Sequence, residues 1–310
     1  MWLLPKYPSS LRKLVLGPLA LIYAMGSGLH RKFWLRPQLP LPRLPLIVIG
    51  SLRAGGAGKT PVTLELAKHL AAQGKRVGIL VYRIRGTEDL EVTAASDWQE
   101  SSDEAVLLAR KTGARVFATR NRAVVWKRMD RAGEFDVLLA DDGLMDTRLG
   151  DTGCGGAFHI CLVRYSERPG VLDLLPAGPY HLTVAALKSM DIVLPFSREI
   201  VLPDNFDFEK RYWVICGMGN PAAFKADLER AGVQIAGLSA GPNHGLPDLG
   251  DPAWGFGAEE SSGFLFSAKD GVKLAERLRS GVLAVEIGER VTFSTGFLSA
   301  VDAFLAPPSS

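Results

Sequence analysis

The sequence has few cysteines and little net charge. Its 310 residues include three cysteines, Cys154, Cys161 and Cys216, an odd set without a CxxC pair. Such a set argues against a disulfide framework or a structural zinc site, and it indicates a reducing compartment with the thiols buried as small hydrophobic groups. The formal charge is only +3, from 36 Lys and Arg against 33 Asp and Glu. This balance excludes the broadly basic surface of a general nucleic-acid binder, so we expect no nucleic-acid partner.

Apolar residues, in contrast, are plentiful. Hydrophobic residues make up 47% of the chain and charged residues 22%. That content excludes disorder of the whole chain, and the length corresponds to about two domains of roughly 150 residues, each with its own core.

The N-terminal region contains an uncharged apolar run, LVLGPLALIYAMGSGL at 14–29, with basic residues on both sides. As a helix it would rise about 24 Å, less than the ~30 Å of a hydrocarbon core. It therefore suits a membrane anchor that does not necessarily span. A buried helix is the first alternative. A cleaved signal peptide is the second, although export would remove the nucleotide site described below from ATP.

A proline-rich stretch, WLRPQLPLPRLP at 34–45, follows this run. Its prolines favour an extended spacer over a helix. Basic residues gather before and within it, at Arg31, Lys32, Arg36 and Arg43. They are either a solvated linker face or a cluster that attracts anionic lipid headgroups.

The next segment has the order strand, glycine-rich loop, helix. The apolar run LIVIG at 46–50 is followed by SLRAGGAGKT, and Val62, Leu66 and Leu70 then recur every four residues. Glycines let backbone N–H groups converge on phosphate oxygens at a helix N-terminus, where a lysine reaches the β and γ phosphates and a threonine ligates Mg²⁺. Arg53 stands where the phosphate-loop pattern has its first glycine, which leaves a chance glycine-rich turn as the alternative. We expect nucleotide binding at Gly55, Gly56, Ala57, Gly58, Lys59 and Thr60.

A second acidic segment completes this expectation. FDVLLA at 135–140 is predicted to be a buried strand, and it ends in Asp141, Asp142 and Gly143. A carboxylate at the end of a strand beside a phosphate loop holds magnesium, so Thr60, Asp141 and Asp142 are the candidate metal ligands. Because strand side chains alternate, only one of the two aspartates is expected to face the metal if the backbone stays extended. A simple Asp-Asp-Gly turn is the alternative.

The C-terminal third repeats a strand-helix-strand order. Strands are predicted at 212–217 and 233–238 around a helix at 222–231, and again at 264–267 and 282–287 around a helix at 270–278. Lys269 and Asp270 are most simply helix-terminal charges. The predicted fold class is α/β, with a P-loop-like parallel sheet domain, a smaller second α/β domain and an N-terminal apolar helix. We expect boundaries at 1–45 for the helix and linker, 46–205 for the nucleotide domain and 206–310 for the second domain.

Several motifs in a fixed order now resemble those of the tetraacyldisaccharide 4'-kinases. They are IVIGSLRAGGAGKTP at 47–61, NRAVVWK at 121–127, ADDGL at 140–144, LLPAGP at 174–179, GMGNPAAF at 217–224 and SAKDGVKL at 267–274. Several weak motifs in one order are more specific than any one of them. The resemblance implies transfer of the γ-phosphoryl group of ATP, with Mg²⁺, to the 4'-hydroxyl of a tetraacylated glucosamine disaccharide 1-phosphate, a lipid A precursor. It also implies a place on the cytoplasmic face of the inner membrane.

The resemblance further implies a catalytic Asp and His pair. The family's Asp-Glu-Pro stretch corresponds to Asp103, Glu104 and Ala105, and its Phe-Pro-Asp-His stretch ends at His244. A sugar hydroxyl is a poor nucleophile, so a carboxylate such as Asp103 can accept its proton while an imidazole from the other domain orients that carboxylate. The expected catalytic residues are therefore Asp103, His244 and Lys59. Taken alone, Asp103 reads as a helix N-terminal carboxylate and His244 as a loop histidine.

This chain departs from the family pattern near the expected site. Met145 and Asp146 replace the usual Gln-His, and Tyr180, His181 and Leu182 stand where an Arg-Glu pair is usual. These changes weaken the expected contacts beside the metal, yet they leave the residues above in place, so we expect catalysis.

Two other hypotheses stay open. One is a P-loop ATPase switch at the membrane, although Ala54 occupies the position of the lysine that such proteins extend across a dimer. The other is a nucleotide-binding but inactive relative that serves as a membrane scaffold.

Overall fold

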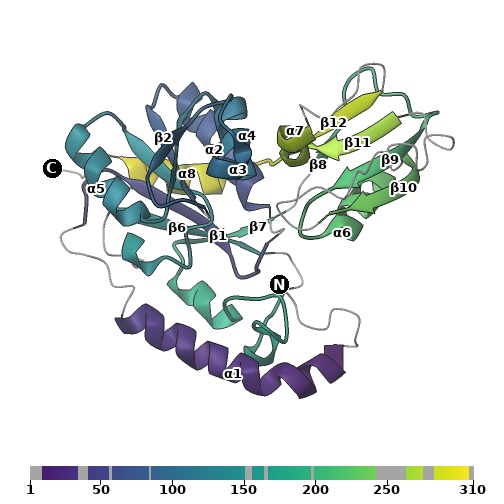
Figure 1. Ribbon diagram of the computed structural model, residues 1–310. Helices are drawn as coiled ribbons and strands as arrows, with labels where there is room; N and C mark the ends of the chain where they lie inside the picture. Colours follow the sequence, from purple (N-terminus) through teal and green to yellow (C-terminus); the bar gives the residue numbers. More distant parts are fainter. Residues whose placement is uncertain are drawn as a thin grey trace.

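In the computed structural model, the chain forms two lobes joined near the middle of the molecule, with one long helix below the larger lobe (Figure 1). The structure describes residues 9–33, 41–55, 58–83, 85–150, 156–163, 167–196, 199–241, 263–274 and 283–306. Each lobe is built on a mostly parallel sheet, so the predicted α/β class is confirmed.

The first lobe contains a seven-stranded sheet in the order β3-β4-β2-β5-β1-β6-β7. Neighbouring strands are parallel except for the β3–β4 pair at one edge. The strands are β1 (Leu46–Ser51), β2 (Val77–Tyr82), β3 (Leu90–Val92), β4 (Arg115–Thr119), β5 (Val137–Ala140), β6 (Ala157–Val163) and β7 (Ile192–Pro195). Central β1 is buried along its whole length, as its continuous apolar run requires in a sheet covered on both faces.

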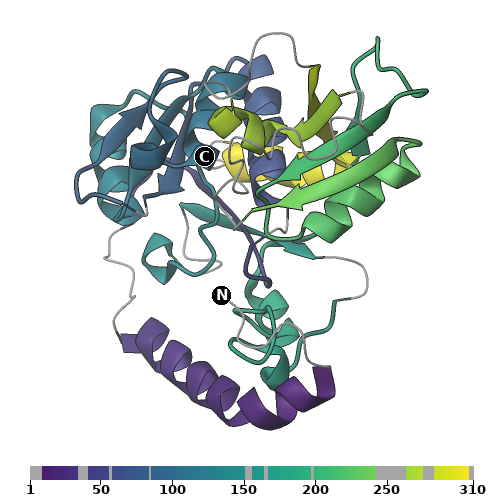
Figure 2. The ribbon, with the colours of Figure 1, turned by 45° about the vertical axis from the view of Figure 1, so that its right-hand side comes forward.

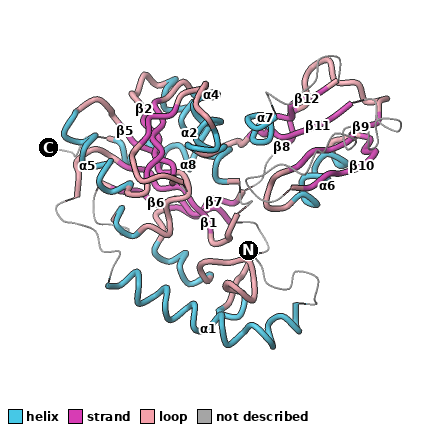
Figure 3. The backbone as a smooth tube through the Cα atoms, in the orientation of Figure 1, coloured by secondary structure: helices cyan, strands magenta, loops and turns pink. Residues whose placement is uncertain are grey.

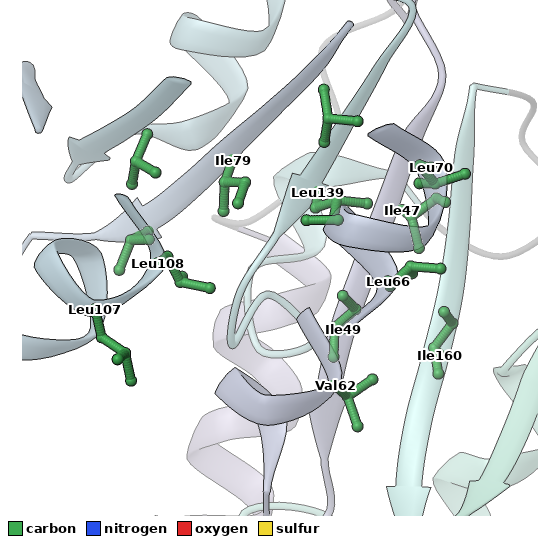
Figure 4. Close-up of a cluster of buried hydrophobic side chains, with 14 of the residues drawn as sticks. Ile47, Ile49, Val62, Leu66, Leu70, Ile79, Leu107, Leu108, Leu139 and Ile160 are labelled. Carbon is green, nitrogen blue, oxygen red and sulfur yellow. The ribbon is translucent and has the colours of Figure 1, made fainter. Parts of the chain in front are cut away.

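Helices cover both faces of this sheet. On one face, Ile47 and Ile49 of β1 pack with Leu66 of α2 and Leu108 of α4 (Figure 4). On the other face, Leu46 and Val48 pack with α5. The first-lobe helices are α2 (Lys59–Ala72), α3 (Trp98–Ser101), α4 (Asp103–Thr112) and α5 (Arg122–Ala132), with short 3₁₀ helices η1 (Thr147–Leu149), η2 (Val171–Asp173) and η3 (Val184–Ser189). Alternate residues of one strand thus support two separate cores.

The second lobe contains a five-stranded sheet in the order β10-β9-β11-β12-β8, parallel except at β8. Its elements are β8 (Glu199–Val201), β9 (Arg211–Cys216), α6 (Pro221–Arg230), β10 (Gln234–Ala240), β11 (Gly263–Ser267), α7 (Ala268–Leu274) and β12 (Ala284–Arg290). The two predicted strand-helix-strand units are present. Helix α7 begins two residues earlier than expected, and residues 275–282 lie outside the described chain. In the backbone view, α7 lies at the junction of the lobes (Figure 3).

The chain crosses between the lobes at places that differ from the expected boundary at 205/206. Strand β8 pairs with β12 and so belongs to the second sheet. The last helix, α8 (Thr295–Leu305), returns to the first lobe, where Phe297 and Val301 join its core and Phe304 stacks on Phe158 at 5.0 Å. Both differences arise from pairings between residues far apart in the sequence, which local patterns do not encode.

The long helix α1 (Ser9–Phe33) covers the expected apolar run and lies along the first lobe (Figures 1 and 2). Leu16 and Ala20 are buried against Leu174 and Ala177. The opposite side of the helix exposes large apolar side chains, for example Leu14 at 77%. No helix in the described chain has the length and apolar character needed to cross a membrane.

Two smaller expectations concern the linker and the cysteines. Residues 34–40 of the proline-rich stretch lie outside the described residues. Cys161 and Cys216 are buried thiols, as predicted, and Cys154 lies outside the described residues. Burial raises the pKa of the Cys161 thiol to about 12, so this group behaves as an inert hydrophobic side chain.

Candidate functional site

The glycine-rich loop lies between β1 and α2, as the sequence predicts. Gly58 immediately precedes α2 with φ of +79°, and a Cβ atom there would meet the ring of Phe196 at 2.0 Å. A side chain is therefore excluded twice, by backbone conformation and by space. Gly55 is also described, whereas Gly56 and Ala57 lie outside the described residues. Helix α2 starts at Lys59 and directs its first N–H groups toward the loop.

The predicted lysine, threonine and aspartates come together at this loop. Lys59 Nζ lies 3.0 Å from Asp142 Oδ2. Thr60 Oγ1 donates a hydrogen bond to Asp141 Oδ2 at 3.1 Å, and Thr63 Oγ1 donates to Asp141 Oδ1 at 2.8 Å. Sequence reasoning missed Thr63, although its place one helical turn after Lys59 puts it on the same face of α2.

Both aspartates reach the loop, contrary to the expectation for an extended chain. Asp142 has φ of 53°, in the left-handed region, so the backbone turns sharply after β5. The turn leaves Asp141 pointing at Thr60 and Thr63 while Asp142 meets Lys59. Aspartate is one of the few residues that tolerate this conformation.

Asp141 is almost fully buried, with 1% exposure. Burial, followed by the charge of Glu104, raises the pKa of its carboxyl to about 6. A buried carboxylate whose direct partners are neutral hydroxyls gains most from a nearby cation. The donor set of Thr60, Asp141 and Asp142 suits Mg²⁺, which takes one or two carboxylates together with substrate phosphates.

A cavity of about 360 Å³ lies beside the loop and has walls from both lobes. The first lobe contributes Gly58, Lys59 and Thr60, and the second contributes Met218, Ser267 and Lys269. The GMGNP turn after β9, which carries Met218, is thus also part of the wall. The cavity places positive charge and a helix N-terminus at one end, the arrangement that binds a polyphosphate.

Charged pairs cross between the lobes at this cavity. Lys269 Nζ lies 2.7 Å from Glu104 Oε1, and Lys111 Nζ lies 2.7 Å from Glu286 Oε1. Burial opposes the charge of Lys269, but the carboxylates of Glu104 and Asp103 outweigh it and raise the lysine's pKa. The expectation that Lys269 is only a helix-terminal charge misses these contacts, because the partners are more than 150 residues apart in the sequence.

Asp103 occupies the expected helix start but does not line the cavity. Its side chain is 1% exposed, and its Oδ2 atom lies 2.7 Å from Nζ of Lys273. Ser102 caps α4 by accepting a hydrogen bond from the N–H of Ala105. The cavity wall instead includes the neighbouring Glu104. His244 lies outside the described residues, so its expected pairing with Asp103 stays a prediction.

The residues that depart from the family pattern pack or pair with neighbouring residues of the first lobe and of α1. Asp146 is buried and pairs with Arg148, with Oδ1 2.6 Å from Nε. Leu182 belongs to the core under α5, and Met145 packs against it. His181 Nδ1 lies 3.2 Å from the hydroxyl of Tyr23 on α1, and burial lowers the pKa of this imidazole.

Arg53 stands where the phosphate-loop pattern has its first glycine, and its side chain contacts residues of the 167–180 segment. Its Nη1 atom lies 3.6 Å from Glu167 Oε1, and its guanidinium lies 5.9 Å from the centre of the Tyr180 ring. Arg53 and Tyr180 also form an isolated antiparallel bridge. The arginine therefore points along the 167–180 segment and leaves the phosphate end of the loop to the later glycines.

Comparison with known proteins agrees with this geometry. Residues 12–205 match the family described as LpxK, tetraacyldisaccharide-1-P 4'-kinase. A tetraacyldisaccharide 4'-kinase of Halorhodospira halophila is 33% identical over 74% of this chain and 75% of its own length, and one of Acidovorax ebreus is 32% identical over 96% and 92%. The fold is similar to that of LpxK from Aquifex aeolicus, crystallised in complex with ATP, with a TM-score of 0.67, 22% identity and coverage of 95% and 99%. The chain belongs to the tetraacyldisaccharide-1-P 4'-kinase family.

Proposed function

We propose that this protein transfers the γ-phosphoryl group of ATP to the 4'-hydroxyl of a tetraacylated glucosamine disaccharide 1-phosphate, a precursor of lipid A. The observation that carries the proposal is the cavity between the lobes, which has the Lys59–Thr60 helix start at one end and second-lobe residues opposite. Family membership supports the same reaction and acceptor.

Residues 55–60 act as the P-loop in this proposal. Backbone N–H groups at the start of α2 bind the β and γ phosphates, and Lys59 places its ammonium against the γ phosphate. Lys59 then exchanges its contact with Asp142 for one with the nucleotide. Mg²⁺, held by Thr60, Asp141 and Asp142, would neutralise charge that develops on the phosphate oxygens.

The acceptor hydroxyl approaches from the side of α4. Asp103 accepts the hydroxyl proton as attack begins, and His244 orients that carboxylate when the lobes close. Glu104 lines the cavity and Asp103 does not, so α4 or α7 must move for the Asp103 carboxylate to reach the sugar.

Helix α1 brings the enzyme to its lipid substrate. One side of the helix packs on residues 174 and 177, and Lys13 Nζ lies 2.6 Å from Asp173 Oδ1. The other side exposes Leu14, Ile22 and Met25, which can enter the acyl boundary of a bilayer while the helix lies along the surface. We place the protein at the cytoplasmic face of the inner membrane, where ATP is present.

The direct test is transfer of radiolabel from γ-labelled ATP to the disaccharide in mixed micelles with Mg²⁺. Labelled lipid that depends on both ATP and acceptor supports the proposal. ATP hydrolysis that ignores the acceptor would favour a switch ATPase, and tight ATP binding without any turnover would favour an inactive relative.

A further inference from the structure

Lys273 is a fully buried lysine that the reaction described above does not use. Its side chain has 0% exposure, and it does not line the cavity. A buried ammonium must be compensated by charged or polar neighbours. Its nearest charged neighbours are Asp103 Oδ2 at 2.7 Å and Asp270 Oδ1 at 3.5 Å, and its Nζ atom lies 6.0 Å from the centre of the Trp98 ring.

Helix α7, which carries Lys273, is fixed to the second sheet by Asp270. The N–H of Gly217, just after β9, donates to Asp270 Oδ1 at 3.0 Å. The hydroxyl of Ser267, the last residue of β11, donates to Asp270 Oδ2 at 2.8 Å. Lys273 therefore extends from a rigid attachment at the ends of two strands, so its ammonium is placed by the second lobe.

The other end of this connection is the start of α4 in the first lobe. Asp103 Oδ1 accepts a hydrogen bond from the N–H of Glu104 at 3.0 Å, which leaves Oδ2 to face Lys273. Ser102, the preceding residue, has φ of 116°, a conformation that costs a non-glycine residue energy and persists only where its surroundings hold it. The two carboxylate oxygens of Asp103 are thus held by different lobes.

We propose that Lys273 is a positioning residue for phosphoryl transfer: it holds the Asp103 carboxylate ionised and oriented, and so couples the position of the second lobe to the readiness of the base. This inference rests on the proposed function of Asp103. Lys273 does not line the cavity, so its effect on transfer passes through Asp103 and not through a direct contact with the substrate.

Lys269, one turn earlier on α7, is the matched comparison. It lines the cavity and pairs with Glu104, whereas its Nζ atom is 3.9 Å from Asp103 Oδ2. Replacement of Lys269 by Met should therefore raise the KM for ATP. Replacement of Lys273 by Met should lower kcat about 100-fold and leave the KM for ATP within about 3-fold of wild type, because misplacement of the base affects the chemical step. Lys273→Arg keeps the charge and should restore part of the lost kcat.

The decisive experiment is a double-mutant cycle on transfer to the disaccharide with wild type, Lys273→Met, Asp103→Asn and the double variant. If Lys273 acts through Asp103, the double variant has the kcat of Asp103→Asn within about 3-fold. A further loss of about 10-fold or more in the double variant would show a separate structural role and overturn the inference. So would a Lys273→Met enzyme with the kcat of wild type.

The double-mutant cycle still tests the inference if the Lys273→Met variant does not fold. If thermal unfolding shows that Lys273→Met does not fold, the comparison of Asp103→Asn with the double variant still decides, because the double variant removes both members of the Asp103–Lys273 pair. A wild-type protein without transfer activity rejects the proposed function and this inference with it. An active wild type with an unaffected Lys273→Met rejects the inference alone.

Discussion

Two buried carboxylates beside the cavity lie in opposite electrostatic surroundings. Asp141, after β5, accepts hydrogen bonds from the neutral hydroxyls of Thr60 and Thr63. Asp103, at the start of α4, has the ammonium of Lys273 at 2.7 Å. The first arrangement retains a negative charge for an incoming cation, while the second neutralises the charge and fixes the carboxylate in place.

The two arrangements also differ in which parts of the chain build them. Asp141 and its partners all belong to the first lobe, within the strand-loop-helix unit that binds phosphate. Asp103 depends on Lys273 from the second lobe, so its surroundings change when the lobes move. The Asp141 site is therefore complete within the first lobe, whereas the Asp103 site needs both lobes.

The largest expected effect is loss of activity on replacement of Lys59, which belongs to the phosphate-binding site formed within the first lobe. Lys59→Ala removes the ammonium at the transferred phosphate, and kcat/KM for transfer should fall on the order of 10³-fold. Lys225→Ala, on the exposed face of α6 where Lys225 pairs with Glu229, is the matched control and should keep wild-type activity. Equal activity of the two variants in the radiolabel assay would remove Lys59 from the mechanism.

Asp103→Asn is the next largest change, and it should destabilise the protein. The substitution leaves Lys273 buried with Asp270 as its nearest remaining carboxylate, and the free energy of unfolding should fall by about 3 kcal/mol. Urea unfolding monitored by tryptophan fluorescence measures this difference. Addition of Lys273→Met should recover part of the loss, and a double variant less stable than Asp103→Asn would contradict the proposed pairing.

Asp141→Asn should change the free energy of unfolding in the opposite direction to Asp103→Asn and so stabilise the ligand-free protein. Because the carboxyl has its pKa raised from 3.8 to about 6, its ionised form costs stability. The cost is absent below pH 3.8, grows as the pH rises to about 6 and is complete above it. Asparagine removes the cost, so stability at pH 8 should rise by about 3 kcal/mol, while activity and Mg²⁺ dependence are lost.

The pH profile of unfolding checks this sign. The advantage of Asp141→Asn over wild type should vanish near pH 4 and be full near pH 8. An advantage that is constant with pH would show that the ionisation of Asp141 is not its cause.

The smallest expected effect concerns the strained residue before Asp103. Ser102→Gly relieves a φ of 116° that glycine adopts freely, and loss of the serine cap to glycine costs only a few tenths of a kcal/mol, so stability should rise by about 1 kcal/mol. Ser102→Ala keeps the strain and loses the cap, so it should destabilise by about the same amount. Thermal unfolding of both variants in parallel distinguishes strain from capping.

The sequence was sufficient for features that depend on local patterns. The strand-loop-helix unit at 46–72 and the buried strand ahead of Asp141 follow from apolar runs and glycine spacing, and the structure contains both. Within this part, Lys59, Thr60, Asp141 and Asp142 come together as expected.

Features that depend on distant partners were not accessible in the same way. Lys269 and Lys273 look like ordinary helix charges because their partners, Glu104 and Asp103, lie in another lobe. The same reason explains the return of α8 to the first core, where Phe297 and Val301 pack against elements far away in the sequence. The expectation that only one of the two aspartates faces the loop applied to an extended backbone, and alternation along a strand does not anticipate the left-handed turn at Asp142.

The most direct test of the central claim is a crystal structure of the wild-type protein with a non-hydrolysable ATP analogue and Mg²⁺. We expect the triphosphate against Gly58, Lys59 and Thr60, the metal within coordination distance of Thr60 and an aspartate of the 141–142 pair, and the nucleoside in the cavity between the lobes. An analogue bound elsewhere, with this loop empty at saturating nucleotide, would contradict this expectation.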